Sequence, residues 1–254
     1  MSACLVQLEP PPVTEPQWRR ALSLVPGYVE ADAVRLAREA HGILLKNLAT
    51  PKAVALQLAF RSAGVETAVV PTEELRLVDA KFTRRLEVTD DALRICDPLG
   101  RLVPVPWAHV ALIAVGAVRQ YDIAQTVTYE KQHAYNPVQG VHQEVVREVR
   151  TSLQENLPWL IEIFLTGGAM RFQTEGAQLA WGYLFKHAPP ELPPRLVALV
   201  RLLVKHAPHA MLNRGALALR DGGDGGVAYA SRPAFSDESA WLLWRARQPG
   251  GRGA

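Results

Sequence analysis

The chain has 254 residues, of which 48% are hydrophobic and 21% charged, and its formal net charge is +3. This composition is ordinary for a globular protein and supplies enough apolar side chains for buried cores, so it excludes wholesale disorder. The 28 basic residues are scattered among 25 acidic residues instead of forming a block, which is not the charge pattern of a nucleic-acid-binding surface.

The first 76 residues predict a small α/β domain. Strand-like and helix-like periodicities follow one another along it, with strands at 3–8, 43–46 and 65–71 and helices at 17–25, 31–40 and 50–64. The last helix has the clearest ends, because Thr50 can cap it, Pro51 suits its first turn and Gly64 terminates it. The predicted order is a βααβαβ plait with one face of its sheet covered.

Residues 32–70, "DAVRLAREAHGILLKNLATPKAVALQLAFRSAGVETAVV", contain a helix of small residues, a short strand, a polar helix start and an Ala-Gly pair before a strand. In this order of elements, residues 3–71 resemble the C-terminal domain of the ribosomal stalk protein. The resemblance implies a topology and no function, because the lysine-rich factor-binding surface of that domain has no counterpart here. The matching helix carries Lys52 and then Gln57 and Arg61 among apolar residues.

From residue 82 the periodicity becomes that of strands, which predicts a second domain over residues 82–220. The run "RRLEVTDDALRICDPLGRLVPVPWAHVALIAVGAV" alternates apolar and polar positions and is interrupted by turn residues at Asp90, Asp91 and in "DPLG". Further strands are predicted in "WLIEIFL" and "AMRFQT". Helices are predicted in "GAQLAWGYLFKH", "PPRLVALVRLLVKH" and "HAMLNRGALAL".

The Pro106-Trp107 pair before the apolar strand resembles the corner of pleckstrin-homology-like bacterial domains, which implies a sheet closed by the "GAQLAWGYLFKH" helix. With "WLIEIFL", "WGYLF" and "LNRGA", residues 82–220 also resemble an uncharacterised bacterial family, which has no known activity to transfer. The predicted fold class is therefore α+β: a small βααβαβ plait followed by a pleckstrin-homology-like antiparallel β domain with C-terminal helices.

Residues 119–157 interrupt the second domain with a polar insertion. Within it, Val141, Val145, Val149 and Leu153 recur every fourth residue, which predicts a helix with one apolar stripe. Such a stripe can dock on its own domain, which is the simpler arrangement, or it can bind a protein partner.

Residues 221–254 are rich in glycine and predict a linker and tail. A short helix is expected in "DESAWLLWRAR", with Ser236 or Asp237 as its cap. Trp241 and Trp244 lie three residues apart on this segment. Large aromatic side chains on a tether suit a groove on a partner, although docking back on the same chain is equally simple.

The sequence offers no constellation for catalysis. No G-x-S-x-G is present, and Cys96 in an alternating strand is better explained as a small core residue. "LTGGAMR" and "DGGDGG" lack the G-K-[ST] ending of a phosphate-binding loop, and His206 and His209 have no further ligand at metal-site spacing. We therefore predict no catalytic residue, no metal site and no cofactor.

The cellular setting is predicted from what the chain contains. Cys4 and Cys96 lie in separate apolar runs, and two lone cysteines in a chain of this length are typical of a reducing compartment. The N-terminal region does not have the pattern of a secretory signal, and no run reaches the ~20 apolar residues of a membrane helix. We expect a cytoplasmic protein with no transmembrane segment.

These observations favour a non-enzymatic bacterial accessory or regulatory protein that acts through an unidentified protein partner, not through nucleic acid. The candidate partner-binding residues are the apolar stripe of the insertion and the two tryptophans of the tail, namely Val141, Val145, Val149, Leu153, Trp241 and Trp244. The oligomeric state is left open.

Two other classes of function are considered. The first is an enzyme or small-ligand-binding protein with a pocket between the two domains, lined from the insertion by Tyr129, His133 and Tyr135. The second, which rests on fold analogy, is binding of anionic lipid by Arg84, Arg85 and Arg101.

Overall fold

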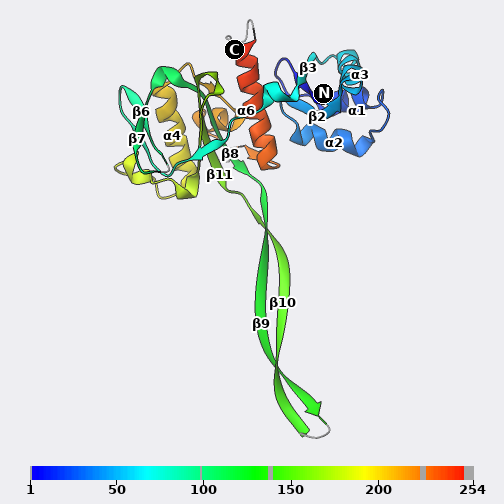
Figure 1. Ribbon diagram of the computed structural model, residues 1–254, viewed down its shortest axis with the longest axis vertical. Coiled ribbons are helices and arrows are strands. Elements are labelled where there is room, and N and C mark those ends of the chain that lie inside the picture. The colour runs from blue at the N-terminus through cyan, green and yellow to red at the C-terminus, as the bar shows by residue number, and fades with distance from the viewer. Residues whose placement is uncertain (1, 98, 137–139, 224–226, 249–254) are drawn as a thin grey trace.

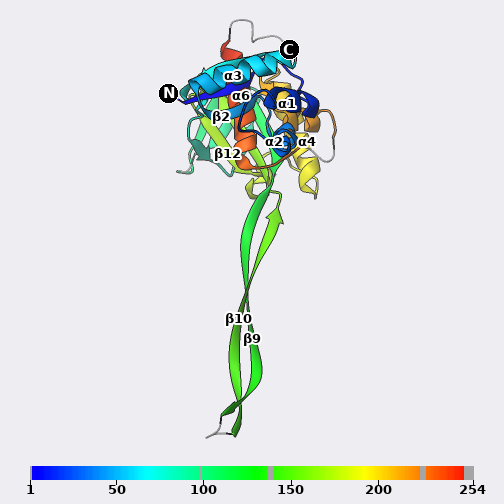
Figure 2. The same ribbon diagram turned by 90° about the vertical axis from the view of Figure 1, so that its right-hand side faces the viewer.

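The computed structural model describes the chain except residues 1, 98, 137–139, 224–226 and 249–254, and for residues 124–126, 128–136, 140–148 and 150 it describes the backbone alone. The protein has an α+β fold, as predicted. Residues 2–75 form an N-terminal unit and residues 80–118 with 159–229 form a larger body. A helix lies between these two parts, and a long two-stranded arm extends away from them (Figures 1 and 2).

The N-terminal unit has the predicted order of strands and helices. Its elements are β1 (Ser2–Gln7), α1 (Glu15–Leu22), α2 (Glu30–Glu39), β2 (Ile43–Ala49), α3 (Thr50–Ser62), β3 (Thr67–Pro71) and a 3₁₀ turn at Thr72–Leu75. The sheet order is β2-β1-β3, and both pairs are antiparallel. Thr50 is the first residue of α3 and not its cap, so the helix begins one residue earlier than expected, while Pro51 lies in its first turn.

Both faces of this sheet are covered, whereas the sequence predicts cover on one. Successive residues of a strand point to opposite faces. Leu5 therefore packs with Trp18 and Phe60 beneath the helices, and those two rings meet edge to face at 4.9 Å. Cys4 and Val6 belong to a second cluster on the other face, which is completed by residues from near the C-terminus.

The body contains two sheets and two helices. Its strands are β4 (Ala80–Phe82), β5 (Leu86–Val88), β6 (Ala92–Cys96), β7 (Leu102–Pro106), β8 (Val110–Val118), β11 (Trp159–Leu165), β12 (Arg171–Glu175), β13 (Met211–Leu212) and β14 (Ala228–Tyr229). Its helices are α4 (Leu192–His206) and α5 (Arg214–Arg220). The larger sheet has the order β13-β8-β11-β12-β4, with β14 also paired to β8, and β5-β6-β7 form the smaller sheet.

The central strand β8 is buried on both faces. One face, with Ile113 and Val115, shares a core with the smaller sheet and with α4, which contributes Leu199 and Leu203. The strand signals at β5 to β8, β11 and β12 are thus confirmed, as is α4. The pairing of β14 with β8 shows that the body continues past residue 220, where the sequence predicts a linker.

The prediction of a helix at 176–187 is wrong. The chain instead makes 3₁₀ turns at Gly176–Gln178 and Trp181–Tyr183. The indole N–H of Trp181 donates to the carbonyl of Gly176 at 2.9 Å, and the Ala180 N–H donates to the carbonyl of Arg84, so these backbone groups are held in turns. The helix that packs across the two sheets is α4, and the pleckstrin-homology-like resemblance stays a prediction.

Helix α6 (Arg232–Arg247) replaces the predicted tail. It begins after Ser231, whose hydroxyl accepts from the Ala234 N–H, so it starts before the expected caps. Figure 1 shows α6 standing between the N-terminal unit and the body. Trp241 and Trp244 are 8% and 6% exposed, which corrects the prediction of a tethered pair that inserts into a partner. They fill the second face of the N-terminal sheet because the same chain supplies the groove.

Polar contacts of three consecutive residues fix α6 to four different elements. Ser236 accepts from Arg171 of β12 at 3.3 Å, Asp237 pairs with Lys46 of β2 at 2.7 Å, and the Glu238 carboxylate reaches α5 and β14. Arg171 is also bound by the fully buried Glu162 of β11 at 2.5 Å. Burial raises the pKa of Glu162, and Arg171 opposes that effect.

The arm corrects the prediction for residues 119–157. Instead of a loop and a helix, β9 (Gln120–Asn136) and β10 (Gly140–Asn156) form an antiparallel ribbon, with Gln120 opposite Asn156. A spacing of four places residues on one face of a helix, but it is also an even number and so places them on one face of a strand. The sequence pattern alone therefore fits a helix and a strand equally well. The pairing with β9 shows that the segment is a strand.

A substitution at Gly42 tests how closely α6 packs against the N-terminal unit. Its φ is +78°, and a Cβ there would lie 2.2 Å from Cδ2 of Trp241. Gly64 has φ +77° with nothing within 4 Å of its Cβ position, so Gly64→Ala reports the cost of the left-handed backbone alone, about 1–2 kcal/mol. We expect Gly42→Ala to lower the thermal unfolding midpoint clearly more than Gly64→Ala, because Trp241 must move. Equal midpoints in calorimetry would contradict this packing.

Candidate functional site

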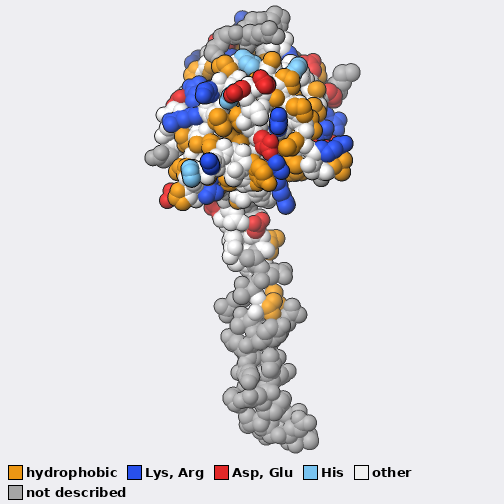
Figure 3. Space-filling view, turned by 90° about the vertical axis from the view of Figure 1, so that its left-hand side faces the viewer, with side chains coloured by type: hydrophobic (Ala, Val, Ile, Leu, Met, Phe, Trp, Pro, Cys, Tyr) orange, Lys and Arg blue, Asp and Glu red, His pale blue; other side chains and the backbone are white. Residues whose placement is uncertain are grey.

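On one face of the arm, five of the seven described side chains are apolar, and the other two are Thr151 and Glu155. Tyr121, Ile123 and Val127 of β9 and Val149 and Leu153 of β10 are all exposed, from 38% for Val127 to 73% for Leu153. In the register Val127 is opposite Val149 and Ile123 is opposite Leu153, and directly opposed residues share a face. Figure 3 shows apolar side chains on the arm, beyond the surface of the rest of the molecule.

The opposite face of the same segment is polar. Asp122 of β9 and Ser152, Gln154 and Asn156 of β10 occupy the intervening positions and are exposed. The Asn156 amide donates to the Asp122 carboxylate at 2.5 Å across the strands. The described part of the arm is therefore an amphipathic ribbon, with one face suited to a partner and one suited to water.

The other predicted residues of the insertion also lie on this ribbon. The backbone of Val141 pairs with that of Tyr135, and Val145 pairs with Lys131. Tyr129 and His133 lie on β9, and their side chains, like that of Tyr135, lie outside the described residues. A pocket lined by Tyr129, His133 and Tyr135 therefore stays a prediction.

Two of the three arginines proposed for anionic lipid are paired with carboxylates of the same chain. Arg85 pairs with Glu87 at 2.5 Å and lies 3.7 Å from the centroid of the Tyr183 ring. Arg101 pairs with Asp97 at 2.7 Å. Since two of the three guanidinium groups are held by neighbouring carboxylates, their charge is largely neutralised locally.

A cleft of about 1290 Å³ lies where the N-terminal unit, the body and α6 meet. His41 and Gly42 line it from the N-terminal unit, Arg214 from α5, and Glu238 and Arg245 from α6. These segments are far apart in the sequence, so no local motif marks the cleft.

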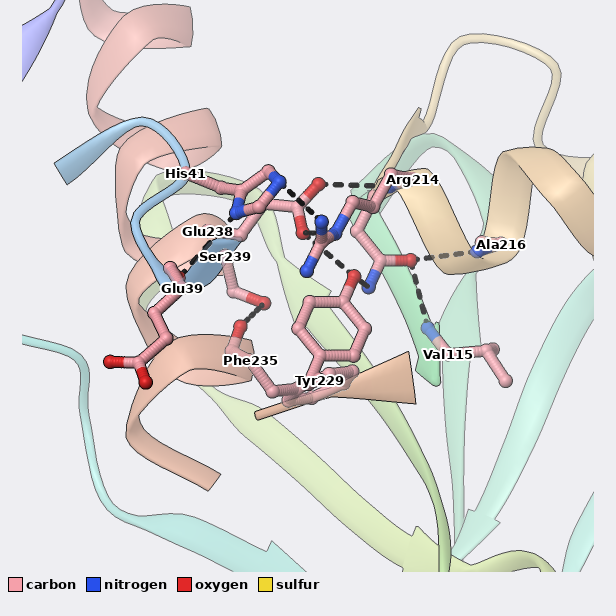
Figure 4. A network of polar contacts seen from close by, with 10 residues as sticks. Glu39, His41, Val115, Arg214, Ala216, Tyr229, Phe235, Glu238 and Ser239 are labelled. Carbon is pink, nitrogen blue, oxygen red and sulfur yellow. Dashed lines mark hydrogen bonds and ion pairs between the residues drawn. The ribbon is translucent and has the colours of Figure 1, made fainter. Parts of the chain in front are cut away.

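A buried polar network lies behind one wall of this cleft and reaches it through His41, Arg214 and Glu238 (Figure 4). Asn213 caps α5 by accepting from the Ala216 N–H at 2.9 Å, and it also accepts from the Val115 N–H at 3.0 Å. Its amide donates to the Tyr229 hydroxyl, which in turn donates to Glu238 at 2.7 Å. Burial and the negative charge of Glu238 raise the pKa of Tyr229, so its hydroxyl keeps its proton. The "LNRGA" motif is thus explained by capping and close packing.

Arg214 joins this network to the N-terminal unit. Its Nε lies 3.3 Å from a Glu238 oxygen, its guanidinium sits 4.4 Å from the Tyr229 ring centroid, and its Nη1 contacts Nε2 of His41. Burial and the nearby Arg214 charge lower the pKa of His41 to about 4. The imidazole is therefore neutral at pH 7. We assign the proton to Nδ1, which faces the Glu39 carbonyl at 3.5 Å, and Nε2 accepts from Arg214.

This arrangement is better suited to holding the parts together than to acid–base catalysis. A general base works best when its pKa is near the working pH, and that of His41 is far below neutral. The Glu238 oxygens are both engaged by Tyr229 and the Arg214 backbone N–H. The remaining charge at the cleft is positive. Arg245 stacks 4.9 Å from the Trp241 ring centroid, and Arg247 donates to the Gly167 carbonyl.

The histidines and cysteines add no second site to the described structure. His206 stacks on Trp107 with ring centroids 4.8 Å apart, and Cys4 and Cys96 are free thiols, the former buried. The described side chains form no cluster of three or more His, Cys, Asp or Glu residues suited to a metal ion. In the same described part of the chain, no helix has the length and apolar character needed to span a bilayer.

No protein family model, curated protein or solved structure matches this chain. The arm and the cleft are therefore the two features from which a function can be inferred. The sequence identifies Val149 and Leu153 on the arm, but it does not single out Tyr121, Ile123 and Val127, and it does not reveal the cleft. Asn213 carries a readable capping signal, whereas nothing near His41 indicates that it meets Arg214.

The His41 contact predicts a pH dependence. Because its folded pKa of about 4 is below the ordinary value of 6.5, the unfolded chain takes up a proton between these values and the folded protein does not. The contribution of His41 to stability is therefore complete above pH 6.5 and is lost as the pH falls towards 4. We expect His41→Gln, which keeps an acceptor but cannot titrate, to show a smaller drop in unfolding midpoint between pH 7 and pH 4.5. Identical pH profiles would show that His41 is protonated in the folded protein.

Proposed function

We propose that this protein is a non-enzymatic accessory protein that acts through protein–protein contacts, and that the β9–β10 arm is its contact element. The observation that carries the proposal is the row of exposed apolar side chains on one face of the arm: Tyr121, Ile123, Val127, Val149 and Leu153. The bacterial source and cytoplasmic location expected from the sequence belong to the same proposal.

The physical reason is that a two-stranded ribbon is marginally stable by itself. Sheets gain stability when a third strand is added or when an apolar face is covered. Among the described elements, β9 and β10 pair only with each other. Single exposed apolar residues need no explanation, but several exposed apolar residues gathered on one face are typical of an interaction surface.

The described titratable groups support a non-catalytic role. Glu162 is held by Arg171, Asp237 by Lys46, and Tyr229 by Glu238, so each acid with a raised pKa already has a partner inside the protein. These groups join elements to one another. The chemistry of the cleft wall is thus accounted for by folding.

Lysine substitutions that introduce charge on the apolar face of the arm test this function. Val149→Lys with Leu153→Lys places two ammonium groups on the apolar face, whereas Ser152→Lys with Gln154→Lys places the same charge on the polar face of the same strand. We expect native affinity purification to recover proteins, including a differently tagged copy of this chain, with the wild type and the polar-face variant but about tenfold less with the apolar-face variant. Identical recovery with all three proteins would contradict a contact role for this face.

A second candidate function is binding of a small anionic ligand in the cleft. The specific observation is the positive lining by Arg245 and Arg247, which in the described structure have aromatic or carbonyl contacts instead of carboxylate partners. This keeps the alternative of a ligand-binding pocket between the two parts, with different residues from those expected.

Inorganic pyrophosphate is the probe for the cleft. A ligand that binds the folded state raises the unfolding midpoint, and the effect of an anion weakens with added salt. We expect pyrophosphate to raise the midpoint of the wild type and of Arg20→Gln/Arg38→Gln, which removes two exposed charges from α1 and α2. Arg245→Gln/Arg247→Gln should lose the shift. An equal shift in both variants would place the anion elsewhere.

A further inference from the structure

We infer that the cleft between the N-terminal unit, the body and α6 binds an amphipathic anion, in which one acidic head group is joined to an apolar chain. A free fatty acid of moderate length is the simplest ligand of this class. The inference rests on the second candidate function, the binding of an anion in the cleft, and it adds the chemical class of the ligand.

The lining of the cleft carries an excess of positive charge. Its described residues include four arginines and one carboxylate, that of Glu238. Two of the arginines already have acidic neighbours, because Arg214 lies 3.3 Å from Glu238 and Arg220 lies 2.8 Å from Asp221. The other two arginines are both in the last turn of α6. A ligand that enters the cleft therefore meets the uncompensated positive charge at that turn.

Arg245 and Arg247 of this last turn lie at one end of the cleft. Arg247 donates to the carbonyl of Gly167 at 3.4 Å, and a Cβ on Gly168 would lie 2.8 Å from its Nη2 atom, so the turn after β11 closely approaches this guanidinium. Glu238 is seven residues before Arg245 on α6, which places it about 10 Å away along the helix. The cleft thus has a cationic end and, about two helical turns away, a polar end.

The polar end does not call for a second acidic group on the ligand. There the charges of Arg214 and Glu238 compensate each other, and His41 is neutral at pH 7. The Glu238 oxygens accept from the Arg214 backbone N–H and the Tyr229 hydroxyl, so this end is held by hydrogen bonds within the protein. The charges of the described lining therefore fit a ligand with one acidic head group.

Apolar side chains line the cleft between these ends. Leu242 follows Glu238 by four residues and precedes Arg245 by three, and this spacing keeps all three on one face of α6. From the body, Met211 and Leu212 of β13 also line the cleft. Leu242, Met211 and Leu212 are half-buried, so part of their apolar surface is open to a ligand. An apolar chain that covers these side chains is removed from water, which is the driving force that an inorganic anion lacks.

A bulge in β8 adds space to the cleft. The register with β11 passes from Phe164 opposite Leu112 to Leu165 opposite Val110, so Ala111 has no opposite residue on β11. A bulge redirects a side chain, and the small side chain of Ala111 lines the cleft. The volume of about 1290 Å³ exceeds the roughly 300–1,000 Å³ of common small-molecule pockets. A small inorganic anion would therefore leave most of this space unfilled.

The test is a titration of the full-length protein with acetate, butanoate and octanoate, measured by isothermal calorimetry. Each buried methylene group raises affinity about fourfold, so octanoate should bind one site with a Kd at least about tenfold below that of butanoate, and acetate should bind more weakly still. Octanol has the same chain without the charge. We expect its Kd to be at least about tenfold above that of octanoate, because it does not pair with the guanidinium groups.

Charge variants locate the head group. Arg245→Gln/Arg247→Gln should raise the Kd for octanoate at least about tenfold. Arg20→Gln/Arg38→Gln removes the same charge from exposed positions of α1 and α2 and should leave that Kd within about twofold.

Volume variants locate the apolar chain. Ala111→Leu fills part of the cleft and should weaken octanoate at least about tenfold while the affinity for acetate stays the same. Ala31→Leu makes the same change at an exposed position of α2 and should have no effect on either ligand. Thermal unfolding without ligand shows whether each variant is folded, and the charge variants carry the test if Ala111→Leu is not.

Four outcomes would overturn the inference. An affinity that does not depend on chain length excludes an apolar chain in the cleft, and octanol bound as tightly as octanoate excludes the acidic head group. Octanoate bound equally by the wild type and by Arg245→Gln/Arg247→Gln lies elsewhere. Cosedimentation with phosphatidylglycerol vesicles without any binding of octanoate would assign the cleft to a membrane surface instead of a free ligand.

The same measurements separate this inference from the function on which it rests. If pyrophosphate raises the unfolding midpoint through Arg245 and Arg247 but octanoate does not bind, the cleft is an anion site for a ligand of another class. If neither pyrophosphate nor octanoate binds, both the inference and the second candidate function are wrong.

Discussion

The insertion of helix α6 between two sheets is the interaction on which the rest of the structure depends. One side of α6 places Trp241 and Trp244 against the N-terminal sheet, and the other places Phe235 and Leu243 against β8 and β11. Apolar burial supplies the driving force, and directional contacts set the position of the helix, among them the indole N–H of Trp241 donating to the Gln7 carbonyl at 2.6 Å. Because α6 packs against both parts, the apolar cluster on one face of each sheet includes residues of this last helix.

The cleft is a consequence of that insertion. The wall network runs from Asn213 through Tyr229 to Glu238, and His41 reaches it from the N-terminal unit through Arg214. A buried network is stabilising when every member has a partner. Here the requirement is largely met by groups from four separate segments, so the same contacts that create the cleft also fix the relation between the two parts.

The arm follows a different physical rule from the body. In the body, β8 is buried on both faces and reads as an almost continuous apolar run. In the described part of the arm, the exposed apolar residues of both strands lie on one face, and the other face is polar. Val149 and Leu153 were identifiable as members of an apolar stripe, but their four-residue spacing fits a helix as well as a strand. Whether this segment forms a helix or a strand depends on its pairing with the preceding strand, β9. The spacing of the stripe does not reveal that pairing.

The sequence by itself determined the α+β class, the element order of the N-terminal unit, and the strands and turns from β5 to β8, because caps, prolines, glycines and apolar periodicity act over a few residues. Only the tertiary structure decided the role of the C-terminal segment, the cleft and the arm. A buried Trp241 and an exposed one have the same local sequence, and the difference lies in whether distant residues supply a groove. Burial depends on contacts between residues such as Gln7 and Trp241, which are separated by almost the whole chain.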